Sequence, residues 1–180
     1  YVPAVTTKQK YVQEVLQKGY NWEDISLYRT KANLLECVER DLRKFKRGDG
    51  DNRVVFFCTT CDPCATEEHA EMTIEAIRLI MEGSDLQVRV LSKSRLILKI
   101  ATELDFYRDR IIYGLSIGTM RPEISACIEE HATPVDERIE TLQLLQGARF
   151  RTFGMLCPIL PSEMDHLDSL VDLIHPQECE

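Results

Sequence analysis

The chain has 180 residues, 44% hydrophobic and 29% charged, which is typical of one globular domain with a substantial core. Its net charge of −8 argues against a duplex-binding surface, because such surfaces need basic side chains opposite the phosphates. No apolar run approaches the roughly 20 residues of a membrane helix, so no membrane partner is expected, and seven cysteines, an odd number, favour a cytoplasmic location over a disulfide framework.

Apolar periodicity predicts helices and strands that alternate along the chain. In chain order we expect a helix over 6–18, a helix over 32–45, a strand over 54–57, a helix from 66 to about 81, a strand over 86–91, a helix over 94–103, a strand over 111–117, a short helix over 123–129, a helix beginning at Pro134, a strand over 150–156 and a last helix capped by Ser162. The first strand is a continuous apolar run, which predicts burial on both faces. The alternation predicts a parallel sheet, and we expect a single α/β domain over 1–180, folded as a partial (β/α) barrel.

Polar segments follow the predicted strands. The carboxyl ends of parallel strands meet at one edge of the sheet, where ligands bind, so we expect convergence there of residues 60–64, 92–94, 116–119 and 157–158. The first segment belongs to a CxxCxxC pattern formed by Cys58, Cys61 and Cys64. Three thiolates at this spacing can share one metal ion or iron–sulfur cluster, with His69 as a candidate fourth ligand. Free thiols that fill space in the core are the alternative.

Short motifs along the chain carry a resemblance to a known family. They occupy residues 28–35, 57–63, 90–94, 115–117, 130–138 and 153–161. In this order they resemble motifs of the spore photoproduct lyase-like group of radical S-adenosylmethionine proteins, which includes the DNA repair photolyase-like proteins. The family's cluster-binding CxxxCxxC is absent from the sequence. Because the chain opens Tyr1-Val2-Pro3, we expect the domain to be truncated there, just after that motif, and to be incomplete at its carboxyl end as well.

The resemblance implies a lyase-like enzyme that uses a 4Fe–4S cluster to cleave S-adenosylmethionine to a 5′-deoxyadenosyl radical, with DNA lesion repair as the activity of the group's best-known member. It implies nucleic acid and an electron donor such as flavodoxin or ferredoxin as partners. By this resemblance Thr60, Asp62 and Pro63 would meet the methionine ammonium, Lys93 the methionine carboxylate and Ser116 a ribose hydroxyl. The cysteines Cys58 and Cys61 would be candidate hydrogen-atom donors.

Each of these residues also has a purely structural interpretation. Asp62-Pro63 is a common turn pair, Lys93 is otherwise a solvated lysine at a helix start, and Ser116 is otherwise a small core residue. Arg138 matches the family pattern, but we interpret it as an ion-pair residue on a helix surface.

Two further readings of the sequence stay open. At the level of function, the alternative is a non-catalytic metal- or cluster-binding module built on Cys58, Cys61 and Cys64. The basic run between Arg40 and Arg47 is the best phosphate-facing patch that the sequence offers, although it is also typical of a solvated helix end.

Overall fold

Four parallel strands form a single sheet in the computed structural model, which describes residues 34–45, 47–48, 53–57 and 62–180. In the order β1-β2-β3-β4, which is also the chain order, the strands are Val54–Phe57, Gln87–Ser92, Ile111–Ser116 and Arg151–Met155. The register pairs Phe57 with Val90, Ser92 with Leu115, and Ser116 with Met155. The predicted parallel α/β arrangement is therefore confirmed, and the carboxyl ends of neighbouring strands lie side by side.

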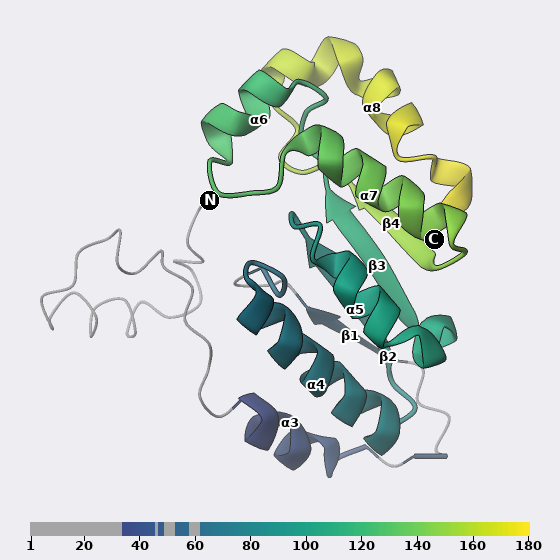
Figure 1. Ribbon diagram of the computed structural model, residues 1–180. Helices are drawn as coiled ribbons and strands as arrows, with labels where there is room; N and C mark the ends of the chain where they lie inside the picture. The colour runs from purple at the N-terminus through teal and green to yellow at the C-terminus, as the bar shows by residue number, and fades with distance from the viewer. Residues whose placement is uncertain (1–33, 46, 49–52, 58–61) are drawn as a thin grey trace, which may run out of the picture.

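Helices precede, connect and follow the strands. They are α3 (Leu34–Leu42), α4 (Glu67–Gly83), α5 (Ile97–Glu103), α6 (Pro122–Ile128), α7 (Val135–Gly147) and α8 (Leu167–Leu173), with short 3₁₀ segments η1 (Asp105–Arg110), η2 (Pro161–His166) and η3 (Pro176–Glu178). Figure 1 shows α4, α5 and α7 lying along one face of the sheet. The predicted helix over 6–18 lies outside the described residues. In the part of the chain that the structure describes, no helix combines the length and the apolar character needed to cross a membrane.

Local signals explain where two of these helices begin. Thr66 caps α4 as predicted, because its hydroxyl accepts a hydrogen bond from the backbone N–H of His69 at 3.2 Å. Ser162 was expected to cap the last helix, and this prediction was wrong. Ser162 lies inside η2, and Leu160, which precedes η2, makes no side-chain capping bond. The chain enters α8 through this 3₁₀ turn, and the residue before α8, His166, makes no side-chain capping bond either.

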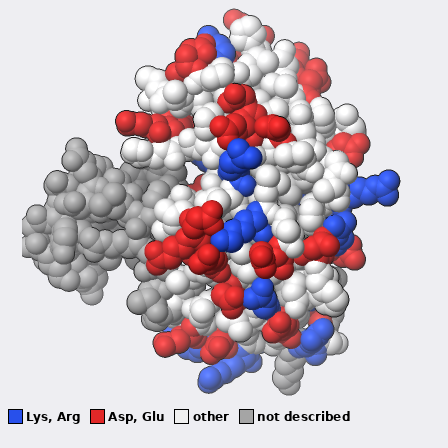
Figure 2. Space-filling view, viewed as in Figure 1, with Lys and Arg blue, Asp and Glu red and all other residues white. Residues whose placement is uncertain are grey.

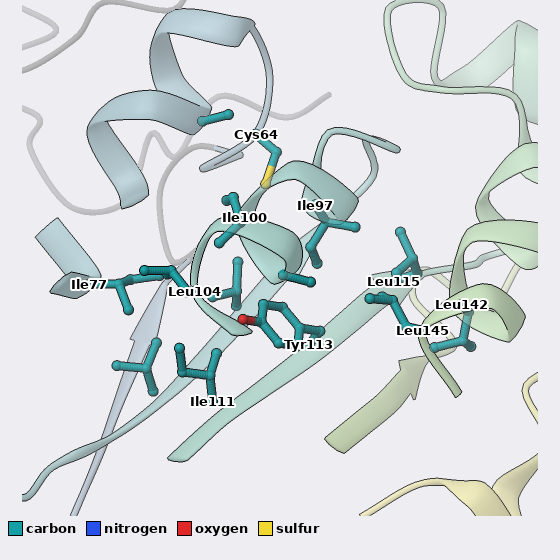
Figure 3. Close-up of a cluster of buried hydrophobic side chains, with 14 of the residues drawn as sticks. Cys64, Ile77, Ile97, Ile100, Leu104, Ile111, Tyr113, Leu115, Leu142 and Leu145 are labelled. Atoms are coloured by element: carbon teal, nitrogen blue, oxygen red, sulfur yellow. The ribbon is translucent and has the colours of Figure 1, made fainter. Parts of the chain in front are cut away.

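The main core lies between the sheet and the helices α4, α5 and α7. Figure 3 shows side chains from these elements converging on β3, whose Ile111, Tyr113 and Leu115 are fully buried. Ile77 of α4, Ile100 of α5 and other fully buried residues close over them, among which Figure 3 labels Cys64, Ile97, Leu104, Leu142 and Leu145. Every residue of β3 is buried, as expected for a strand with a neighbour on each side.

Strand β1 departs from the prediction that it is buried on both faces. Val55 and Phe57 pack against the main core, whereas Val54 and Phe56 face the other way and are 47% and 40% exposed. β1 is the terminal strand of the four-stranded sheet, so it has a described neighbour on one side only. Four apolar residues in a row form a strand in either environment, and their sequence does not distinguish an edge strand from a central one.

On the sheet face opposite the main core, the ring of Phe153 in β4 lies across Gly114 in β3. A Cβ atom built at Gly114 would fall 2.3–2.6 Å from three atoms of that ring. The ring reaches over β3 to the guanidinium of Arg89 in β2, 4.9 Å from its centroid, and its centroid is 6.5 Å from that of Phe56 in β1. Aromatic and cation–π contacts therefore join all four strands on this face, and they require a residue without a side chain at position 114.

We predict that Gly114→Ala destabilises the protein by about 1–3 kcal/mol, because the new methyl group overpacks against the Phe153 ring. Urea unfolding followed by circular dichroism measures the loss. Gly147→Ala is the matched control, since no atom within 4 Å would meet its methyl group. Equal stability of the two variants would contradict the described position of the Phe153 ring.

Candidate functional site

The carboxylate of Asp62, in the part of the chain that follows β1, binds the end of β2. Its Oδ1 accepts hydrogen bonds from the Cys64 N–H at 2.8 Å and the Ser92 hydroxyl at 2.7 Å, and its Oδ2 accepts from the Lys93 N–H at 2.7 Å. The first of these bonds is the local turn that Asp62-Pro63 indicates. The other two reach the end of β2, so the same side chain, only 5% exposed, holds the segment 62–64 against that strand end.

Lys93 is held at both its backbone and its ammonium group. Its N–H is bonded to Asp62, its carbonyl oxygen accepts from the Thr133 N–H at 3.1 Å, and its Nζ forms a close ion pair with Glu129. The Lys93 side chain is 23% exposed. This lysine precedes α5, which begins at Ile97, and its side chain does not extend freely into solvent as the structural interpretation would have it.

Arg138 is a fully buried charged residue at this edge of the sheet, with none of its surface exposed. Its Nη1 donates to the carbonyl oxygen of Ser116 at 2.7 Å, and its Nη2 donates to the Ser125 hydroxyl at 2.7 Å and to Glu129 at 2.5 Å. Our interpretation of Arg138 as a surface ion-pair residue was therefore wrong. It lies on the inward face of α7, at helical spacing from the buried Val135, Leu142 and Leu145.

Glu129 links the two cations. One carboxylate oxygen meets Lys93 and the other meets Arg138, while the residue itself is 7% exposed. Burial raises the pKa of the Glu129 carboxyl, but the hydrogen bond from Lys93 and the charge of Arg138 outweigh this effect, and the pKa lies below its ordinary value of 4.5. The Lys93–Glu129–Arg138 triad consequently carries a net charge of +1 at neutral pH, and Asp62 beside it carries −1.

Ser116 joins the ends of β3 and β4. Its hydroxyl donates to the carbonyl oxygen of Cys157 at 2.8 Å, next to the cis peptide bond between Cys157 and Pro158. Gly118 continues this close approach, because a Cβ atom there would lie 2.7 Å from the Pro158 carbonyl oxygen. The expected convergence of the segments after the strands is thus confirmed for residues 62–64, 92–94, 116–119 and 157–158. Thr60 lies outside the described residues.

The cysteine pattern is only partly described. Cys58 and Cys61 lie outside the described residues, and Cys64 is fully buried in the main core, near Ile97 and Ile100 in Figure 3. Its neighbour Pro63 has its carbonyl oxygen bonded to the Thr73 hydroxyl at 2.9 Å. Among the residues with described positions, no group of three potential metal ligands comes together. A shared ion at this pattern stays a prediction, and the apolar surroundings of Cys64 favour the packing interpretation.

Sequence reasoning missed some of the residues that build this edge. Glu129 and Ser125 were not singled out, and the resemblance pointed instead to Glu130, which is exposed. One signal could have identified the partners of Arg138: an arginine on an apolar helix face needs a buried anion and hydrogen-bond acceptors close by. Arg138 lies on α7, and the acidic residues that most closely precede this helix are Glu129 and Glu130. The signal would therefore have narrowed the buried anion to one of these two residues.

The basic run at the end of α3 is partly neutralised. Arg40 and Lys44 both approach Asp41, at 3.5 and 3.0 Å, and Arg47 donates to the Glu82 carbonyl oxygen at 3.3 Å. The helical face is the face of the molecule that α4, α5 and α7 cover (Figure 1). Figure 2 shows acidic and basic side chains interspersed over it, with acidic ones in excess. The described residues of this face therefore form no continuous basic surface of the kind that nucleic acid requires.

Comparisons of this chain with known protein families, curated proteins and solved structures identified no relative. No protein-family model matches the chain, and no match was found among curated proteins or solved structures.

We predict that Arg138→Leu lowers the free energy of unfolding by about 3 kcal/mol, because it removes one partner of a buried ion pair and leaves the Ser116 carbonyl unpaired. Arg95→Leu is the control. Arg95 pairs with Glu137 at 3.1 Å, but its side chain is 60% exposed, and the expected loss stays within about 1 kcal/mol. Equal losses in denaturant unfolding would show that the Arg138 pair contributes no more than a surface pair.

We also predict a pH dependence for Glu129→Gln. Because the folded-state pKa of Glu129 is lowered, its ionised form stabilises the protein above the unfolded pKa, and this stability disappears as the pH falls through the folded-state value. The stability difference between wild type and Glu129→Gln should be largest near pH 7 and shrink below about pH 4.5. Other carboxyl groups titrate in both proteins and cancel in the difference. A pH-independent difference would exclude an ion-pair contribution from Glu129.

Proposed function

We propose that the chain is the sheet-bearing part of a radical S-adenosylmethionine enzyme of the spore photoproduct lyase-like kind, and that it binds S-adenosylmethionine at the carboxyl ends of its strands. The observation that carries this proposal is the connection of Asp62, Lys93 and Ser116, which the resemblance singled out separately. Asp62 is bonded directly to Lys93, and Lys93 is linked through Glu129 and Arg138 to Ser116.

The charges of this edge suit an amino-acid group. Asp62 offers an anion and Lys93 a cation. The Asp62 carboxylate binds the Lys93 backbone N–H, so the two side chains start from neighbouring points, while the Lys93 ammonium itself pairs with Glu129. The methionine part of S-adenosylmethionine carries an ammonium and a carboxylate on one carbon, and each would meet its opposite charge here. The Ser116 hydroxyl gives its proton to Cys157, and its oxygen keeps the capacity to accept from a ribose hydroxyl.

The remaining parts of the proposal rest on the resemblance. When bound, a 4Fe–4S cluster would supply the electron that cleaves S-adenosylmethionine. The family's CxxxCxxC ligands are not among the residues of this sequence, and we take the four-stranded sheet as part of a (β/α) barrel in a cytoplasmic enzyme. A flavodoxin- or ferredoxin-like donor and a nucleic-acid substrate belong to the same proposal, although the acidic helical face in Figure 2 directs any nucleic acid elsewhere.

Cys58 and Cys61 keep their proposed role as hydrogen-atom donors, and Thr60 its place in the ammonium-binding loop. The competing proposal, a metal-binding module built on Cys58, Cys61 and Cys64, finds less support. It would require the fully buried Cys64 thiol to leave the apolar core and join the other two.

The test uses the product of the complete reading frame, purified without oxygen and supplied with iron, sulfide and a reductant. We expect it to bind S-adenosylmethionine and release 5′-deoxyadenosine, and we expect Lys93→Gln to weaken S-adenosylmethionine binding about tenfold or more, since a charge-assisted hydrogen bond is lost. Lys99→Gln is the matched control. Lys99 forms ion pairs with Glu67 and Glu71 on the helical face and should leave binding unchanged. Absence of both binding and 5′-deoxyadenosine would refute the proposed function.

A further inference from the structure

We propose that Glu129 and Arg138 are positioning residues, which hold the Lys93 ammonium where the carboxylate of the bound ligand meets it. The inference rests on the proposed function, because it specifies how one contact of that site is made. Neither residue is expected to touch the ligand. Arg138 is fully buried and Glu129 is 7% exposed, so both act through Lys93.

A lysine is poorly suited to fixed recognition unless something holds its side chain. Its ammonium sits on a flexible four-carbon stem that populates many rotamers in solvent. Here Asp62 and Thr133 fix the Lys93 backbone, and Glu129 fixes the far end of the side chain. With both ends held, the ammonium is placed before any ligand arrives, and binding loses less conformational entropy.

Arg138 makes this use of Glu129 compatible with an anionic ligand. A lone Glu129 would cancel the charge of Lys93 and leave the negative charge of Asp62 uncompensated, and this would disfavour a carboxylate. Arg138 contacts the other oxygen of Glu129 at 2.5 Å and contributes a second positive charge, so the triad as a whole remains positive. The Nη1 bond from Arg138 to the Ser116 carbonyl oxygen anchors this charge to the end of β3.

The positioning role and the charge of Glu129 predict opposite changes in ligand affinity for the substitution Glu129→Gln. Glu129→Gln removes a negative charge close to the site, and by charge alone this would strengthen the binding of a carboxylate. Positioning predicts the opposite. Lys93 and Arg138 bind different oxygens of Glu129, and in glutamine one of these two positions becomes an NH2 donor, so one cation loses its acceptor and the bridge between the two cations breaks. The buried guanidinium, with no access to water, is expected to keep the acceptor and release Lys93.

A double-mutant cycle tests the inference. S-adenosylmethionine affinity is measured by equilibrium dialysis for the wild type, Lys93→Gln, Glu129→Gln and the double variant, at a temperature where unfolding curves show each to be folded. We expect Glu129→Gln to weaken binding about tenfold, and less than twofold when Lys93 is already replaced, because its effect passes through Lys93. Glu71→Gln, which removes a partner of Lys99 on the helical face, is the matched control and should change nothing.

The outcomes separate this inference from the proposed function. If the wild type binds S-adenosylmethionine but Glu129→Gln binds it equally or more tightly, the positioning role is refuted and the proposed function stands. The positioning role is likewise refuted if the two substitutions act additively, since Glu129 would then influence binding independently of Lys93. A wild type that binds no S-adenosylmethionine refutes both.

Discussion

The buried guanidinium of Arg138 is the constraint on which this edge of the sheet depends. A positive charge without exposed surface is unfavourable unless anions and acceptors surround it, and Arg138 obtains them from the end of β3, from α6 and from the segment after α6. Meeting this requirement brings Glu129 against Lys93, and thereby couples β3 to β2. Asp62 extends the connection to the segment 62–64 that follows β1, and Ser116 extends it to the loop after β4. One buried charge thus accounts for much of the polar order at the strand ends.

Periodicity predicted the fold well because its signals are local. The apolar run over 111–117, the cap at Thr66 and the start of a helix after Pro134 all depend on neighbouring residues, and each matches an element of the structure. The burial of β1 was mispredicted because it depends on which elements cover each face, and four apolar residues carry no information about that.

Sequence reasoning predicted which segments meet at this edge of the sheet better than it predicted which side chains contact one another there. Parallel topology alone is enough to bring Asp62, Ser92, Lys93 and Ser116 to one edge. Which side chains meet there depends on the length and path of the chain between α6 and α7, and no short-range pattern reports this. Glu129 and Glu130 are adjacent in sequence, yet one bridges two cations and the other is exposed. The same limit explains the error at Arg138, whose helical spacing indicates a buried face while its charge suggests an exposed one.

The segment from Glu129 to Thr133 holds Lys93 at two points at once. Glu129 engages the ammonium, and the Thr133 N–H engages the Lys93 carbonyl oxygen at 3.1 Å. The residues between these two anchors, 130–132, therefore form a spacer whose length both contacts depend on. Inserting or deleting one residue there would separate either the Lys93 ammonium from Glu129 or the Lys93 carbonyl oxygen from Thr133, even if every contacting side chain were retained.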